Sequence, residues 1–146
     1  IKIQEHSQVA YLFISHDLAV VRYISDRVAV MYLGEICEFG ESEAVFVGPH
    51  HPYTEALLAS IPDVHRTAPR EGCASLRGTI PSLTHPPSGC RFHTRCPHSL
   101  LGLCDRERPP WRDLGEEHWI RCHMVAWAGD TRTGTLGLRH AVAGEV

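Results

Sequence analysis

Val9-Ala-Tyr-Leu-Phe-Ile14, followed directly by Ser15-His16-Asp17, is the stretch that decides the fold of this 146-residue chain. The six apolar residues do not alternate with polar ones, and they are rich in β-branched and aromatic side chains. Such a run is typical of a strand buried on both faces, as in a parallel sheet. Asp17 is a suitable N-cap for a helix over residues 18–24, where apolar side chains recur at helical spacing. The sequence therefore predicts an α/β fold that opens on a strand and a helix.

The next segments extend this pattern. Val28–Leu33 predicts a second buried strand, and a turn at Gly34-Glu35 leads into a third short strand, Ile36–Phe39, which closes a hairpin. Two short helices are predicted after it: one over residues 43–47 that Ser42 caps and Gly48-Pro49 ends, and one from Pro52 to Ile61.

These elements are too few for an independent α/β domain, because a strand buried on both faces needs neighbours and covering helices. We therefore expect residues 1–47 to be the incomplete C-terminal end of a larger domain. Residues 48–124 are expected to form a small, loop-rich extension that is rich in Pro and Cys, and residues 125–146 a flexible tail.

Composition excludes several classes of protein. The single lysine, Lys2, leaves no room before it for the G-x-x-x-x-G-K-[ST] loop, so the chain is not a self-sufficient P-loop ATPase. The longest apolar runs have six residues, whereas a membrane span takes roughly 20, so we expect no direct span. The arginines are not clustered and interleaved with aromatic residues, which argues against nucleic acid as a partner.

His16 is the first candidate functional residue. It directly follows the predicted strand 9–14, and ligands of open α/β sheets bind outside the carboxyl ends of strands. An imidazole there can donate a hydrogen bond to a phosphate oxygen or to an attacking water. On the residue pattern alone, a solvated loop histidine is an equally good interpretation.

Four cysteines form a second candidate site, with the spacing C-x5-C-x7-C-x17-C at Cys90, Cys96, Cys104 and Cys122. Four thiolates can hold either a tetrahedral Zn²⁺ or a [4Fe–4S] cluster. The lack of a C-x2-4-C knuckle and the Cys96-Pro97 step favour the cluster. If the metal were zinc, nearby histidines could replace a cysteine, namely His93, His98, His118 and His123. Separate buried thiols are the remaining alternative.

Two other stretches of the sequence resemble a known protein family. Residues 12–21, together with Ser25-Asp-Arg-Val-Ala-Val-Met-Tyr-Leu-Gly34, resemble the switch-histidine region of ABC-transporter ATPases. Pro49-His-His-Pro-Tyr-Thr-Glu-Ala-Leu-Leu58 is similar to a stretch that marks the ATPase subunits of dipeptide and oligopeptide importers. The resemblance covers about residues 8–124.

This resemblance implies the C-terminal edge of an ABC ATPase domain of the P-loop type, followed by a small cysteine domain. It makes His16 the switch histidine, which would contact the γ-phosphate of Mg-bound ATP and help position the hydrolytic water. It also implies that Cys90, Cys96, Cys104 and Cys122 hold an iron–sulfur cluster, as in some members, with a structural role. The family's Walker A, signature and Walker B motifs are missing here. The chain alone is therefore expected to be inactive, whereas a complete subunit would hydrolyse ATP.

The resemblance further implies a place in an importer that couples ATP hydrolysis to uptake of di- or oligopeptides or related small solutes. The partners would be two transmembrane permease subunits and a second ATPase subunit, at the cytoplasmic face of the cell membrane. Two alternatives stay open from the sequence: a stand-alone four-cysteine metal-binding module without nucleotide activity, and a non-functional remnant.

Overall fold

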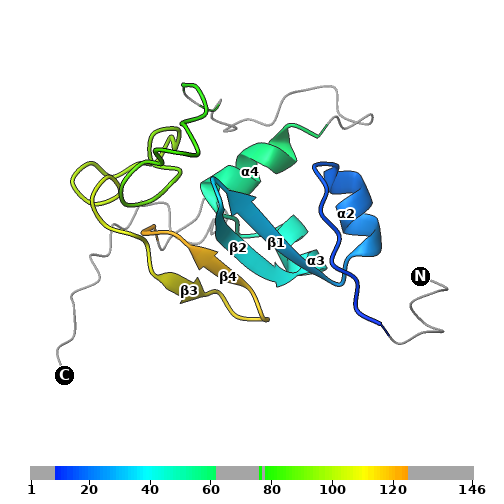
Figure 1. Ribbon diagram of the computed structural model, residues 1–146. Helices are drawn as coiled ribbons and strands as arrows, with labels where there is room; N and C mark the ends of the chain where they lie inside the picture. The colour runs from blue at the N-terminus through cyan, green and yellow to red at the C-terminus, as the bar shows by residue number, and fades with distance from the viewer. Residues whose placement is uncertain (1–8, 62–75, 77, 125–146) are drawn as a thin grey trace, which may run out of the picture.

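The computed structural model describes residues 9–61, 76 and 78–124, which form a small sheet with helices beside it and a loop-rich region at one end (Figure 1). Its elements are α2 (Leu18–Ile24), β1 (Arg27–Tyr32), β2 (Glu35–Glu41), α3 (Ser42–Val47), α4 (Pro52–Ala59), β3 (Trp111–Asp113) and β4 (Trp119–Arg121). The predicted tail, residues 125–146, lies outside the described residues.

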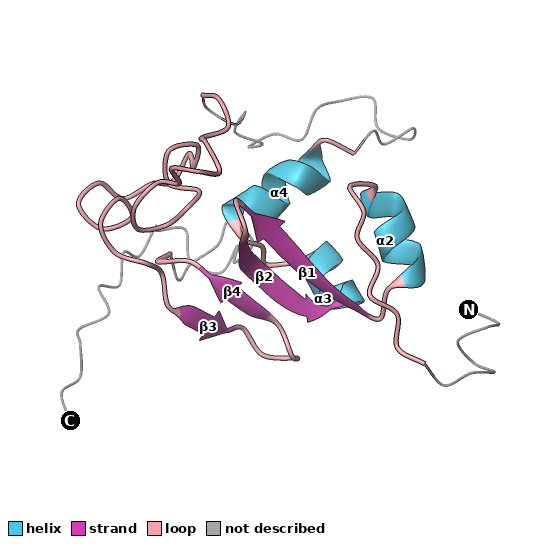
Figure 2. Cartoon of the chain, in the orientation of Figure 1, coloured by secondary structure: helices cyan, strands magenta, loops and turns pink. Residues whose placement is uncertain are grey.

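The four strands form one antiparallel sheet in the order β1-β2-β4-β3 (Figure 2). The predicted hairpin is present as β1-β2, with Arg27 opposite Glu41, but its turn is Leu33-Gly34 rather than Gly34-Glu35, because Glu35 already pairs with Tyr32. The pair β3-β4 comes from the far end of the described chain and joins the hairpin through β2. The sheet therefore ties the cysteine-containing region to the hairpin.

A β-bulge in β2 changes which side chains are buried. Val30 pairs with Glu38 but the next residue, Met31, pairs with Ile36, so that Cys37 is an extra residue in the ladder. A bulge breaks the alternation of a strand locally. Cys37 and Glu38 are consequently both buried although they are neighbours.

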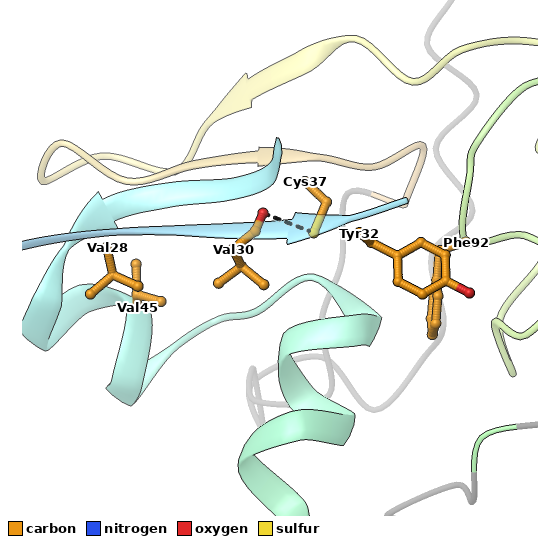
Figure 3. Packing of buried hydrophobic residues seen from close by; sticks show 6 residues of the cluster. All are labelled: Val28, Val30, Tyr32, Cys37, Val45 and Phe92. Carbon is orange, nitrogen blue, oxygen red and sulfur yellow. Dashed lines mark hydrogen bonds between the residues drawn. The ribbon is translucent and has the colours of Figure 1, made fainter. Parts of the chain in front are cut away.

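The apolar core lies between the hairpin, the helices and the cysteine loops. Val28, Val30 and Tyr32 project from β1, whose alternating residues are exposed, and Val45 of α3 packs against the same face (Figure 3). Phe92, from the loop after Cys90, completes the cluster and is only 2% exposed. Burial of this single aromatic side chain anchors the cysteine region to the sheet.

The prediction of a buried strand at residues 9–14 is wrong for the described structure. This segment has no strand pairing, and Leu12 and Ile14 are 91% and 89% exposed. A strand needs a neighbour for its backbone N–H and C=O groups, and the described residues supply none at this place. Residues 28–32 do form a strand of the predicted hairpin, but the predicted burial of the whole run 28–33 is wrong, since β1 is buried on alternate residues only.

The helices follow the prediction more closely. Asp17 caps α2, with its Oδ1 accepting hydrogen bonds from the amides of Ala19 at 3.0 Å and Val20 at 3.2 Å. α3 begins one residue earlier than predicted, at Ser42. α4 begins at Pro52 as predicted but ends at Ala59 rather than at Ile61. Within the described ranges, no helix combines the length and apolar character that crossing a bilayer requires.

Candidate functional site

His16 lies in the exposed segment that leads into α2. The neighbouring hydrogen bonds order this segment: the amide of Asp17 donates to Ser15 Oγ at 3.0 Å, and the Asp17 carboxylate caps the helix. α2 is held to α3 by the Arg22 guanidinium, which lies 5.5 Å from the centre of the Phe46 ring. The structure thus places His16 on an ordered helix entry, with its side chain open to solvent.

The structure does not bring His16 and the cysteines together. The loop before α2 and the loops that carry the cysteines lie at opposite ends of the sheet (Figure 1). His16 and the cysteines are therefore two separate candidate sites.

The four predicted cysteines lie on three segments that meet beside the hairpin. Cys90 and Cys96 lie on consecutive turns, Cys104 lies in the following turn, and Cys122 comes directly after β4. Cys104 and Cys122 are buried, whereas Cys90 and Cys96 are half-buried and pack against the core cluster.

All six pairs among these four thiols are close enough for the charge on one sulfur to raise the pKa of the other. Residues that are far apart in sequence therefore lie near one another, although by the same criterion Cys37 also lies near Cys90 and Cys122. Among residues 9–61, 76 and 78–124, however, no three His, Cys, Asp or Glu side chains are arranged to hold one metal ion.

A backbone amide faces each of the four sulfurs. The amide of Leu100 lies 3.4 Å from Cys104 Sγ, and the amides of Phe92, His98 and Met124 face Cys90, Cys96 and Cys122, respectively. Cys37 behaves differently, because its thiol donates a hydrogen bond to Val30 O at 3.4 Å (Figure 3). Backbone donors thus face the four sulfurs, an environment that suits a thiolate, which accepts hydrogen bonds. Cys37 instead donates its S–H and is a thiol of the apolar core.

Burial favours the protonated thiol at Cys90, Cys96 and Cys122 when no cation is near. It raises the pKa of Cys96 to about 11 and that of Cys122 to about 12, and it also raises the pKa of Cys90. Coordination by a cationic centre reverses this effect, because a coordinating thiol loses its proton.

Gly89 allows the loops to approach each other at Cys90. It has a positive φ of 63°, and a Cβ at this position would overlap the carbonyl oxygen of Cys104. The amide of Cys90 donates to that same carbonyl at 2.8 Å. Only glycine accommodates both the conformation and the close contact.

The histidines that could have replaced a cysteine around zinc take part in other hydrogen bonds. His93 Nδ1 lies 2.9 Å from Cys90 O, and His123 Nε2 lies 3.0 Å from Glu107 O. His118 Nε2 lies 2.8 Å from Glu38 Oε1. These three rings are held at oxygen acceptors rather than at the sulfurs.

A network of charges that the sequence did not reveal flanks the cysteines. Glu35, the first residue of β2, contacts Arg91 at 2.8 Å, Arg108 at 2.6 Å and Arg121 at 3.7 Å. Burial raises the pKa of Glu35, but the hydrogen bonds from Arg91 and Arg108 outweigh it, so the pKa lies below its usual value. Three guanidinium groups against one carboxylate leave positive charge next to Cys90 and Cys122.

Glu38 is the second residue that sequence reasoning missed. It is fully buried in β2, and its Oε2 accepts a hydrogen bond from the amide of His51 at 2.8 Å, while Oε1 contacts His118. Burial alone would raise its pKa, but the hydrogen bonds, led by that from His118, hold the pKa below its usual value. The only sequence signal is an acidic residue beside a buried cysteine in a predicted strand.

Comparison with known proteins adds the family. Residues 37–104 match the family described as "Oligopeptide/dipeptide transporter, C-terminal region". The oligopeptide transport ATP-binding protein AppF of Bacillus subtilis is 44% identical over 127 residues, which are 86% of this chain and 38% of that protein. A peptide ABC transporter ATP-binding protein of Sinorhizobium fredii is 45% identical over 126 residues, or 85% of this chain and 35% of that protein.

A peptide import ATP-binding protein of Brucella ovis is 48% identical over 120 residues, which cover 82% of this chain and 37% of that protein. The chain thus spans less than two fifths of the length of these relatives. The matched stretch begins at Cys37 and includes Cys90, Cys96 and Cys104. These matches show that the chain belongs to the oligopeptide and dipeptide transporter ATP-binding proteins, as the C-terminal part of such a subunit.

Proposed function

We propose that this chain acts as the C-terminal part of the ATP-binding subunit of an ABC importer that couples ATP hydrolysis to uptake of di- or oligopeptides or related small solutes. The observation that carries the proposal is the similarity to oligopeptide transport ATP-binding proteins over 86% of the chain. The same similarity gives the stand-alone metal-binding module no support.

In this proposal His16 is the residue that meets ATP. His16 is exposed and directly precedes the Asp17 cap of α2, so its ring is accessible to a ligand. It would donate a hydrogen bond to the γ-phosphate of Mg-bound ATP or to the attacking water. The phosphate-binding loop and the carboxylate that polarises water would come from the rest of the subunit.

The same proposal implies the binding partners of the subunit. The subunit would pair with a second ATPase subunit and bind two transmembrane permease subunits at the cytoplasmic face of the membrane. This chain would then be peripheral to the membrane rather than inserted in it.

We propose that Cys90, Cys96, Cys104 and Cys122 hold a [4Fe–4S] cluster rather than a single zinc ion. The support is their spacing, which lacks a C-x2-4-C knuckle and includes the Cys96-Pro97 step. The backbone amide of Leu100, 3.4 Å from Cys104 Sγ, is the kind of donor that cluster sulfurs accept. When bound, the cluster would supply ligation energy that stabilises a region with little core of its own.

Uptake tests the importer function. In cells that encode the chain, His16→Ala is expected to reduce uptake of a labelled oligopeptide by about a hundredfold or more, the effect of losing a positioned acid–base group. His85→Ala is the matched control, because His85 is also an exposed loop histidine. Normal uptake in the His16 variant, or equal loss in both variants, would contradict the role of His16.

Iron analysis tests the cofactor. Purified without oxygen, the chain is expected to hold about four irons and to absorb near roughly 400 nm. Cys104→Ser is expected to lose most of this iron, whereas Cys37→Ser keeps it, since Cys37 is buried but faces Val30 O instead of the cluster. Equimolar zinc without colour, or equal iron loss in both variants, would sink the cluster assignment.

A further inference from the structure

The pair β3-β4 has a small connection to the rest of the sheet. β4 pairs with β2 through only two residue pairs, Glu38 with Ile120 and Phe39 with Trp119. Among the described residues, the three-residue strand β3 is the one strand beyond β4. Because a short two-stranded hairpin is marginal in water by itself, side-chain contacts must hold β3-β4 against β2.

One of these contacts is fully buried. Glu38 Oε1 lies 2.8 Å from Nε2 of His118, which is 3% exposed and directly precedes β4. The other carboxylate oxygen of Glu38 accepts from the amide of His51, the N-cap residue of α4. A single carboxylate thus links β2, the start of α4 and the start of β4.

Ile120 of β4 is also buried, at 1% exposed, but the other polar and aromatic links between these elements are more exposed. Arg27 and Glu117 form an ion pair at 3.0 Å, but both side chains are about half exposed or more, so solvent screens the pair. Phe39 stacks on Trp119 with ring centres 6.0 Å apart. A buried hydrogen bond to a charged group costs far more to lose than an exposed pair.

Gly40 provides separate support for this contact. A Cβ at Gly40 would lie 3.0 Å from Glu117 O and 3.1 Å from His118 Cα, both of them backbone atoms. The φ of Gly40 is not positive, so backbone conformation does not require glycine here. What requires it is the close approach of the turn that brings His118 to Glu38.

We propose that Glu38 is a positioning residue that, through His118, holds β4 in register on β2 and thereby places Cys122 beside the other three cysteines. Cys122 directly follows β4, and its carbonyl accepts a hydrogen bond from Arg112 Nε at 3.0 Å, which fastens it to β3. The role of Glu38 in holding β4 on β2 does not depend on a bound metal. Only the consequence for Cys122 as a ligand rests on the proposed cluster.

Hydrogen–deuterium exchange on the full 146-residue chain tests the fastening. In Glu38→Gln, amides of β4 are expected to exchange at least about tenfold faster, while those of β1 stay within about twofold. Glu41→Gln is the matched control, an exposed glutamate on the same strand, and should leave β4 unchanged. Faster exchange in β1 and β4 alike would make Glu38 an ordinary core residue and overturn the proposal, as would unchanged exchange in β4.

A conservative pair separates the hydrogen bond from packing. His118→Gln keeps a side-chain donor for Glu38 and is expected to leave β4 protected, whereas His118→Leu should match Glu38→Gln. Equal exchange in the two His118 variants would contradict a role for the bond.

Iron content gives the second readout. Glu38→Gln is expected to hold less iron than Glu41→Gln. A parent chain that binds no iron would overturn the cluster but not the fastening, which the exchange data decide. Full iron in Glu38→Gln would show that Glu38 does not place Cys122.

Discussion

Phe92→Ala is expected to lower the free energy of unfolding by about 3–5 kcal/mol, the usual cost of removing a buried aromatic side chain. Phe92 contacts Tyr32 edge to face with ring centres 5.1 Å apart, and Tyr53 at 5.4 Å. Its backbone carbonyl also accepts from the amides of Arg95 and Cys96, both at 3.0 Å. The side chain therefore joins the cysteine loop to both the hairpin and α4.

Urea denaturation followed by circular dichroism measures this effect. Leu101→Ala is the matched control, because Leu101 lies in a neighbouring loop and is 91% exposed; we expect it to change stability by less than about 0.5 kcal/mol. A Phe92 variant as stable as the Leu101 variant would show that the cysteine region does not depend on this anchor.

The local parts of the fold could be predicted because they depend on neighbouring residues. Asp17 caps α2 through amides two and three residues away, and a two-residue turn, Leu33-Gly34, closes the hairpin between adjacent strands. The conformation of residues 9–14 could not be predicted correctly. Their apolar composition is typical of a buried strand, but it does not show whether a neighbouring strand is present to pair with them. Apolar composition and pairing are separate requirements.

The candidate site likewise has parts that the sequence could predict and parts that it could not. Residue type and spacing select Cys90, Cys96, Cys104 and Cys122 as a candidate ligand set, and the metal they would hold stays a prediction. The buried Glu38 was not predictable, because its burial depends on the bulge at Cys37 and its partner His118 lies 80 residues away. A charged residue that a distant histidine satisfies leaves no periodic signal in the sequence.

Glu38 and Phe92 together explain how a region with few regular elements is held in place. Phe92 fixes the loop that carries Cys90 and Cys96 by apolar burial, and Glu38 fixes β4, which leads to Cys122, by a buried polar bond. The two anchors reach the same place in the fold, because His51 lies between them: its ring centre is 5.8 Å from that of Phe92 and its amide binds Glu38.

His51 is expected to make the chain less stable in mild acid. It is 1% exposed, and its Nδ1 accepts the amide of Tyr53 at 3.1 Å, which caps α4. Burial lowers the pKa of His51 to about 4, although the charge of Glu38 opposes this. Because the folded-state pKa lies below the unfolded-state value of about 6.5, the stabilisation is complete above that pH and is lost progressively toward pH 4. Between about pH 7.5 and pH 5, the loss is on the order of 2 kcal/mol.

His51→Asn tests this directly, because asparagine can still cap α4 through its side-chain oxygen but does not titrate. The variant loses the ring contact with Phe92, so the diagnostic quantity is the pH dependence of the unfolding free energy rather than its level. We expect urea denaturation to give a flatter pH dependence for His51→Asn, while His85→Asn, at an exposed site, keeps that of the parent chain. The chosen range lies above the lowered pKa of Glu38, so protonation of that carboxylate does not contribute. An unchanged pH dependence in His51→Asn would show that groups other than the buried, neutral imidazole of His51 cause the acid sensitivity.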